Sequence, residues 1–400
     1  MPNKRNVGLL AVSQGLFQSV QSMGIATSPL AGYALLGEDK SLATLPIFLN
    51  HAGIMLTTIP ASLLMDRIGR RAGFSIGAIL GILFGGLAAY AVFVQSFTLL
   101  CVATLIQGSA AAFAWYYRFA AADAAPPDYK AKAISLVMAG GVIAGLVGPQ
   151  LAKWSVNWFA PVVFAGVYVT IALIGLLSLI VVQFVRIPRL TASERAEGGR
   201  PLSEIARSQT FLTALITSML GYGVMTLLMS STPLAMQACG FKFEDSATVI
   251  QAHVVAMFLP SFFTGHLITR FGTLPIIAAG AIIQTGCAIV NLMGIDFWNF
   301  LIANLLVGLG WNFTFVGGSA LLTTTYRPAE RARVQAAHDF CVYSTTAIAA
   351  GLAGFLQQKA GWTVVNIAAL PLMAVIVTAA MLLARRQRLE AGLAAPTGKP

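Results

Sequence analysis

Long uncharged apolar runs alternate along this chain with short polar connections. We place twelve runs, at 8–33, 42–65, 72–94, 97–122, 133–153, 158–184, 210–236, 247–269, 274–293, 297–323, 334–357 and 362–384. Each has about 20 residues or more, which is enough for a helix to cross the hydrocarbon core of a bilayer. Strands of a membrane barrel would show short alternating segments instead, and no such alternation appears. Because backbone in lipid must satisfy its hydrogen bonds within its own segment, the pattern predicts twelve transmembrane helices.

The composition agrees with a membrane protein and excludes a soluble one. Hydrophobic residues make up 57% of the 400 residues and charged residues 10%, whereas a soluble domain carries about 25% charged residues. The one long polar connection falls between the sixth and seventh runs. We therefore predict an all-α membrane protein of two six-helix bundles, residues 1–185 and 210–400, which a central loop at 186–209 joins. The second bundle ends in a short tail.

Basic residues gather in alternate connections. If the N-terminus lies inside, the inner segments hold all of the 25 lysines and arginines except Lys40, Lys153, Lys242 and Lys359. This bias is the positive-inside pattern, and it predicts a multi-pass protein of the bacterial inner membrane whose termini and central loop are cytoplasmic. The net charge of +11 does not indicate a nucleic-acid partner, because phosphate-binding side chains would share one folded face.

Two short polar segments of the first half recur in the second half. Residues 62–72 read SLLMDRIGRRA and residues 265–275 read GHLITRFGTLP, so the pattern L-x-x-R-x-G recurs 203 positions later. Residues 127–132 read PDYKAK and residues 328–333 read PAERAR, at an offset of 201 positions. Both pairs lie in inner connections, which predicts two homologous halves. Parallel repeats of this kind place the substrate site between the halves, near the bilayer midplane.

The segment at 62–72 resembles the loop signature of the major facilitator superfamily, G-x-L-a-D-r-x-G-r-r, which lies between the second and third helices of that family. Ser62 replaces the first Gly, and Thr269 replaces the Asp in the copy. The motif and its copy are carried here by Asp66, Arg67, Gly69, Arg70, Arg71, Gly265, Arg270 and Gly272. In the family an acid at the inner end of the fourth helix often engages the motif's arginine, and Asp123 matches that place. The resemblance implies two pseudosymmetric bundles that rock to give alternating access.

The charges of the motif suggest how it works. We expect Arg67, Arg70 and Arg71 to anchor the loop at the anionic inner leaflet, and Asp66 to accept from helix-end amides or from a neighbouring arginine. Such contacts form in one conformer and break in the other, which makes the loop a gating element. The alternative is that the cluster only fixes the orientation of the chain in the membrane.

Charged side chains within membrane helices are costly and functional by default. Arg118 and Asp339 each lie about six residues from the inner end of a run, at a depth of roughly 9 Å. In the family the inner gate is formed by helices 4 and 5 against helices 10 and 11, so we expect these two residues to pair across that gate when the protein faces outward. The alternatives are that each charge snorkels to its own interface, or that it pairs with Asp123 or His338.

Four residues are candidates for carrying a coupling proton, namely His51, His253, His338 and Asp339. Histidine titrates near neutral pH, so a small change in its surroundings changes its charge. The alternative is structural, because buried polar groups are generally hydrogen-bonded.

Polar and aromatic residues at helical spacing predict the lining of a substrate cavity. They are Gln14, Gln18, Gln21, Trp115, Tyr116, Tyr222, Asn304, Trp311 and Asn312. A polar stripe on an apolar helix faces protein or water rather than lipid. Each of these residues therefore contacts either the solute or only a neighbouring helix.

The predicted function is secondary transport of a small organic solute by alternating access, coupled to protons, with import and export both open. A facilitated-diffusion uniporter and an organic-anion importer are alternatives, the latter because of Arg118. No Walker motif is present, which excludes an ATP-driven pump within this chain. A membrane-embedded enzyme or a non-transporting receptor is the rival class, but no H-E-x-x-H or G-x-S-x-G motif occurs. We expect no enzymatic activity, no cofactor, no metal site, and a monomer in the bilayer.

Overall fold

The computed structural model describes residues 4–38, 42, 45–187 and 199–394, and within these ranges it is helical and without strands. In chain order the helices are α1 (Lys4–Leu35), α2 (Leu45–Ile68), α3 (Arg70–Phe93), α4 (Phe97–Ala114), α5 (Tyr117–Asp123), η1 (Pro127–Tyr129), α6 (Lys130–Ala139), α7 (Gly141–Ser155), α8 (Ala165–Gln183), α10 (Leu202–Ile205), α11 (Gln209–Ala238), α12 (Phe243–Phe258), α13 (Ser261–Phe271), α14 (Thr273–Met293), α15 (Phe297–Leu322), η2 (Pro328–Glu330) and α16 (Arg331–Ala394). Lys40 and most of the predicted central loop lie outside the described residues.

Ten of the described helices are long and apolar enough to cross a membrane, or eleven if α12 and α13, which are bent by 41° at their break, form one span. Two of the ten spans come from α16, which divides at Gly361. The 32-residue helix α1 is not among these candidates. Its buried glutamines and serines make it less apolar than the others, so the twelfth span remains a prediction. The sixth predicted run begins at 158, whereas α8 begins at Ala165 after a series of turns.

Both copies of the sequence motif break a helix in the same way. Gly69, between α2 and α3, has φ 92°, and Gly272, between α13 and α14, has φ 91°. Glycine adopts positive φ without the steric cost that a Cβ brings. Two glycines 203 positions apart therefore make equivalent junctions.

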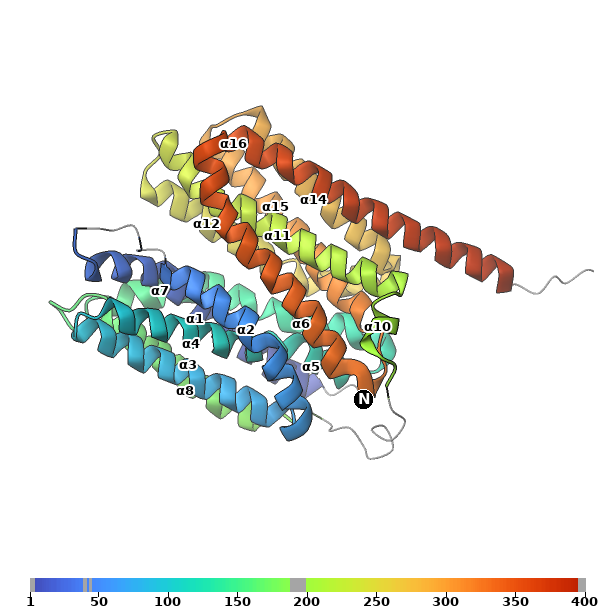
Figure 1. Ribbon diagram of the computed structural model, residues 1–400, viewed down its shortest axis with the longest axis horizontal. Helices are drawn as coiled ribbons and strands as arrows, with labels where there is room; N and C mark the ends of the chain where they lie inside the picture. The colour runs from blue at the N-terminus through green and yellow to red at the C-terminus, as the bar shows by residue number, and fades with distance from the viewer. Residues whose placement is uncertain (1–3, 39–41, 43–44, 188–198, 395–400) are drawn as a thin grey trace, which may run out of the picture.

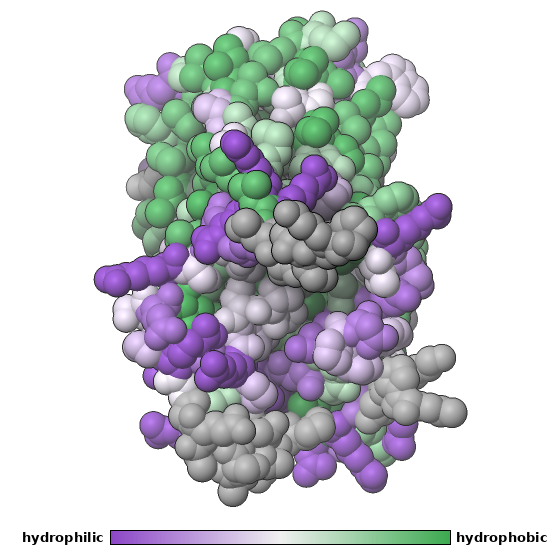
Figure 2. Space-filling view, turned by 90° about the vertical axis from the view of Figure 1, so that its right-hand side faces the viewer, coloured by the Kyte–Doolittle hydropathy of each residue, from purple (hydrophilic) through white to green (hydrophobic). Residues whose placement is uncertain are grey.

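Helices α1–α8 and α11–α16 form two groups, which we call the first and second helix groups (Figure 1). They touch where α2 packs against α16, where α6 packs against α13, and where α7 packs against α12. The start of α1, the α2–α3 junction, α10 and the last turns of α16 all lie at one end of the molecule (Figure 1). We call it the basic end, because it carries the motif arginines. Figure 2 views this end and shows hydrophilic side chains gathered over much of it.

Candidate functional site

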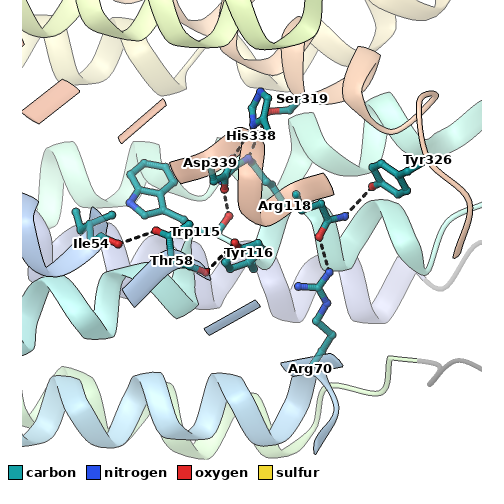
Figure 3. Close-up of polar contacts among 11 residues, drawn as sticks. Ile54, Thr58, Arg70, Trp115, Tyr116, Arg118, Ser319, Tyr326, His338 and Asp339 are labelled. Atoms are coloured by element: carbon teal, nitrogen blue, oxygen red, sulfur yellow. Dashed lines mark hydrogen bonds and ion pairs between the residues drawn. The ribbon is translucent and has the colours of Figure 1, made fainter. Parts of the chain in front are cut away.

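A buried ion pair joins the two helix groups. On α5, the Nη2 atom of Arg118 lies 2.7 Å from both carboxylate oxygens of Asp339 on α16. Both side chains are at most 1% exposed. The other nitrogens of Arg118 donate to the carbonyl oxygen of Trp115 and, at 3.3 Å, to Oγ of Ser319 on α15 (Figure 3). Removing one partner of a buried pair leaves an uncompensated charge, so the pair ties α5 to α16.

His338 extends this pair into a row of three titratable side chains. Its Nδ1 lies 2.8 Å from Oδ1 of Asp339, so the carboxylate is placed between an imidazole and a guanidinium (Figure 3). Its Nε2 is buried without a hydrogen-bond partner among the described residues. With Nδ1–H donating to Asp339, Nε2 is an acceptor that has room for a proton.

Near the basic end, the side chain of the motif arginine Arg70 points into the protein interior. Its Nη2 donates to Oδ2 of Asp123 at 3.0 Å and to Oε1 of Gln335 on α16 at 2.6 Å. Nη1 of Arg331 lies 3.7 Å from the same Asp123 oxygen. Gln335 in turn donates to the Tyr326 hydroxyl at 2.7 Å (Figure 3). This network again connects the first helix group to the second.

The expectation that all three motif arginines face the leaflet is wrong for Arg70, which is only 6% exposed. Arg67 and Arg71 are exposed, and Asp66 is half-buried. Arg70 begins α3, on the face that packs against the fourth span, so its direction follows from helix packing and not from the loop. The structure therefore brings only one of the three arginines to Asp123.

The second motif copy meets the first group through backbone contacts. The backbone N–H of Gly265 donates to Oγ of Ser135 on α6 at 2.9 Å. A Cβ on Gly265 would lie 2.7 Å from Cα of Lys132. On the other side of the interface, Oγ of Ser62 donates to the carbonyl oxygen of Ala332 at 2.9 Å. The repeated segments thus dock crosswise: residues 62–72 meet 328–333, and residues 265–275 meet 127–132.

A further ion pair, between Arg200 and Glu330, lies at this end. Arg200, just before α10, donates from Nε and Nη2 to the carboxylate of Glu330 at 2.9 and 2.8 Å. The Glu330 side chain is 1% exposed. The hydrogen bonds to Glu330 raise the pKa of the Arg200 guanidinium above its usual range. The pair fastens the segment that precedes α10 to the second helix group.

Aromatic rings from both helix groups pack together beside the Arg118–Asp339 pair. This ring cluster consists of Phe17, Trp115, Tyr222, Phe258, Trp311, Phe315 and Tyr343. Trp115 of the first group lies 5.6 Å from Tyr343 of the second, centroid to centroid. Phe315 stacks on Trp311 at 5.0 Å and also lies 4.8 Å from the Arg118 guanidinium carbon. The ring cluster is therefore in direct contact with the Arg118–Asp339 pair.

Most of the other predicted lining residues bond to neighbouring helices. Gln21 accepts from Gln107 at 2.9 Å. The Gln14 amide lies 4.0 Å from the Met138 sulfur. The Tyr116 hydroxyl donates to the carbonyl oxygen of Thr58 at 3.1 Å, away from the ring cluster (Figure 3). Each of these residues therefore contacts a side chain or carbonyl of a neighbouring helix.

The same holds for the two predicted asparagines of α15. The Asn304 amide donates to Oγ1 of Thr232 at 3.1 Å. Asn312 accepts from Oγ1 of Thr264 at 2.7 Å and donates within the second group. Gln18 is buried on α1. Only Trp115, Tyr222 and Trp311 of the nine candidates belong to the ring cluster.

The remaining histidines lie apart from the carboxylate row. Nδ1 of His51 lies 2.9 Å from the carbonyl oxygen of Ile47 in its own helix. Nδ1 of His253 lies 2.9 Å from the carbonyl oxygen of Asn304. Both contacts fit the structural alternative, whereas His338 touches an acid.

Sequence reasoning missed Phe315, Tyr343 and Gln335. A phenylalanine in an apolar run is indistinguishable from a lipid-facing one by composition. The usable signal was spacing, because Trp311 and Phe315 are four residues apart and so share a helix face.

The comparison with known families decides the class of protein. A family model described as Major Facilitator Superfamily matches residues 9–294 and 252–399. The chain belongs to the Major Facilitator Superfamily. The fold agrees, and members of this superfamily are transporters and not enzymes.

Among relatives of this superfamily member, the riboflavin transporter RfnT of Brucella anthropi is 40% identical over 375 residues, which cover 93% of this chain and 94% of RfnT. The transporter FucP, solved in the outward conformation, superposes with a TM-score of 0.75 at 19% identity, over 94% of this chain and 98% of FucP. The human organic anion transporter MFSD10 (TETRAN) gives 0.76 at 15% identity, over 95% of this chain and 100% of that one. The two structures share the fold.

Proposed function

We propose that this superfamily member is a secondary transporter whose solute is riboflavin. The observation that carries the proposal is the 40% identity to a riboflavin transporter across nearly the full length of both chains. The ring cluster supports it, because the isoalloxazine ring of riboflavin is flat and aromatic and stacks on tryptophan and tyrosine. The pairing of Arg118 with Asp339 speaks against an organic-anion importer, since the arginine already has its counter-charge.

We infer that transport proceeds by alternating access between two moving units, residues 1–185 and 210–400, joined by a loop at 186–209. The contacts at the basic end support a conformer that is shut on the side we assign to the cytoplasm. They are the Arg70–Gln335 hydrogen bond, the Ser62–Ala332 hydrogen bond and the close approach of Gly265 to α6. Rocking of the units has to break these contacts before solute leaves on that side.

A proton at Asp339 is the coupling step that we propose. Protonation removes the counter-charge of Arg118, and a buried unpaired charge is costly, so α5 and α16 then separate more readily. His338 supports this assignment, because its Nδ1 touches the carboxylate and its Nε2 is free to accept a proton. Proton binding at this row would therefore favour the state open at the basic end.

Flux into proteoliposomes that hold the purified full chain tests the proposal. Riboflavin is followed by its own fluorescence after an imposed pH gradient, with protein-free liposomes and Asp339→Asn as controls. We expect gradient-dependent accumulation that Asp339→Asn abolishes, and the sign of the accumulation separates import from export. Flux that only equilibrates and ignores the gradient indicates facilitated diffusion and removes the coupling step. Folded protein that gives no flux above empty liposomes overturns riboflavin transport.

A further inference from the structure

We propose that the ring cluster is a clamp for the isoalloxazine ring of an uncharged flavin, and that it rejects phosphorylated flavins. Trp115 forms the face from the first helix group, and Tyr343 forms the face from the second. The inference rests on the proposed function and adds to it which part of the solute is recognised and which solutes are refused.

The geometry of the cluster selects these two rings as the faces. Trp115 and Tyr343 are tilted by 37°, whereas Trp115 meets Tyr222 and Phe315 at 72° and 80°. The Trp115–Tyr343 pair is thus the most nearly parallel of the ring pairs that cross between the groups in the described chain. Both residues are at most 5% exposed. A flat ring enters only between faces that are nearly parallel.

The entry of a third ring requires the two groups to move apart. Atoms in van der Waals contact lie about 3.5 Å apart, so two faces with a ring between them are about 7 Å apart. The Trp115 and Tyr343 centroids are 5.6 Å apart. The faces must therefore open by at least about 1–2 Å, in the direction that rocking of the groups supplies. Ring binding and rocking are coupled by this requirement.

Two buried hydrogen-bond donors of the cluster suit the edge of such a ring. Nε1 of Trp115 and Nε1 of Trp311 are buried without a partner among the described residues. An indole N–H only donates, and buried donors are normally satisfied. The carbonyl oxygens and ring nitrogens of an isoalloxazine accept hydrogen bonds. The two donors come from opposite helix groups, so a ring edge that reaches both also bridges the groups.

The charge around the cluster accounts for the rejection of phosphate. Among the described residues, Arg118 is the cation that contacts cluster rings, at 4.8 Å from Phe315 and 5.9 Å from Trp115. Asp339 already neutralises it. A phosphate monoester would bring a charge of about −1.5 to −2 into this site. While Asp339 is ionised, the phosphate would meet no unmatched cation there, and its desolvation would be uncompensated.

Fluorescence binding of the purified full chain tests the clamp, because stacking on tryptophan quenches flavin emission. Riboflavin is titrated directly, and three competitors of radiolabelled riboflavin follow: lumiflavin, which is the isoalloxazine ring without the ribityl chain, ribitol, which is the chain alone, and riboflavin 5′-phosphate. We expect lumiflavin to compete within about 10-fold of riboflavin, since stacking contributes most of the binding. Ribitol should not compete, and the phosphate should be about 100-fold weaker or worse, because its charge stays unpaired.

Variants of Trp115 separate stacking from simple packing. Trp115→Leu removes the aromatic face, and we expect riboflavin and lumiflavin to bind about 10-fold more weakly. Trp115→Phe keeps a ring and should stay within about 3-fold of the wild type. Trp154→Leu is the matched control, because Trp154 is 67% exposed at the end of α7; its affinity should not change.

The outcomes distinguish a failure of the proposed clamp from a failure of the proposed riboflavin transport. Equal competition by riboflavin and its phosphate, or wild-type affinity in Trp115→Leu, overturns the clamp while riboflavin transport stands. Wild-type protein that is folded and binds no riboflavin overturns both. Monodispersity in size-exclusion chromatography checks that each variant is folded, and competition by riboflavin 5′-phosphate for the wild-type protein keeps the test decisive if the leucine variant is not.

Discussion

At the scale of single residues, the two buried arginines Arg70 and Arg118 both pair with a carboxylate but have different surroundings. Arg118 lies between the rings of Phe119 and Phe315, with its guanidinium carbon 4.3 and 4.8 Å from their centroids. Arg70 instead joins the acid of its own group to Gln335 of the other. Aromatic faces add cation–π attraction where water is excluded. The Arg118 pair is thus the drier of the two links between the groups.

Replacing Asp339 by Asn should loosen the link between α5 and α16. We expect a loss of about 3 kcal/mol of stability, because Arg118 is left buried without a counter-charge. The state open at the basic end should be populated more often. Thiol labelling of a single cysteine at Ser62, in a cysteine-free background, should become faster.

The double variant Arg118→Gln with Asp339→Asn is the control for this prediction. It removes both charges and should recover part of the lost stability. Unchanged labelling at position 62 in the single variant would contradict a gating role for the pair.

Replacing Arg70 by Lys should slow transport although the charge is kept. Both hydrogen bonds, to Asp123 and to Gln335, are donated by the terminal Nη2 of Arg70. The lysine ammonium ends one bond closer to the backbone, so it does not reach both acceptors. The exposed neighbour Arg71 is the matched control, and Arg71→Lys should leave the flux unchanged. Equal flux in both variants would show that position 70 contributes only charge.

At the scale of helices, the two sides of the basic end are closed by different means. Where the α2–α3 junction meets α16, the closure uses side chains, including Arg70 of α3 and Gln335. Where α13 meets α6, it uses backbone, with Gly265 against Lys132. Both contacts involve the repeated segments, but only the first copy has an acid, Asp66, and a buried arginine, Arg70. The side-chain contacts depend on charge and hydrogen bonding, whereas the backbone contact depends on the size of the side chain at position 265.

Replacing Gly265 by Val should prevent closure of the basic end. Even a Cβ at this position would lie 2.7 Å from Cα of Lys132, and backbone does not yield as a flexible side chain does. We expect reduced transport and persistent labelling of the Ser62 cysteine. Gly286→Ala is the control, because a Cβ there would lie 3.8 Å from Leu306 in ordinary contact. Normal transport by Gly265→Val would show that this approach is not required.

At the scale of the whole molecule, the start of α1, α10 and the last turns of α16 share one end (Figure 1). Each helix group reaches that end with its copy of the motif, and the ion pairs lie there or just inside it. The molecule therefore has one strongly charged end. This arrangement is consistent with the orientation that the positive-inside pattern predicts.

The native Cys239 reports this orientation directly. It is exposed at the end of α11, away from the basic end. A membrane-impermeant maleimide should label it in intact cells, and Cys239→Ser should remove the signal. Labelling that appears only after the membrane is permeabilised would invert the predicted topology.

The sequence by itself determined the all-helical membrane fold, the basic connections and the two motif copies, because length, hydropathy and charge are local properties of a chain. Of the twelve predicted spans, ten or eleven are found among the described residues. The sequence also supplied three members of the ring cluster, Trp115, Tyr222 and Trp311. The partners of the charges were decided by tertiary structure. The chain left Arg118 open to Asp339, Asp123 or His338, and helix packing gave it Asp339 and gave Asp123 to Arg70. These partners are over 50 and over 200 positions apart, so only the crossing of distant helices fixes which of them meet.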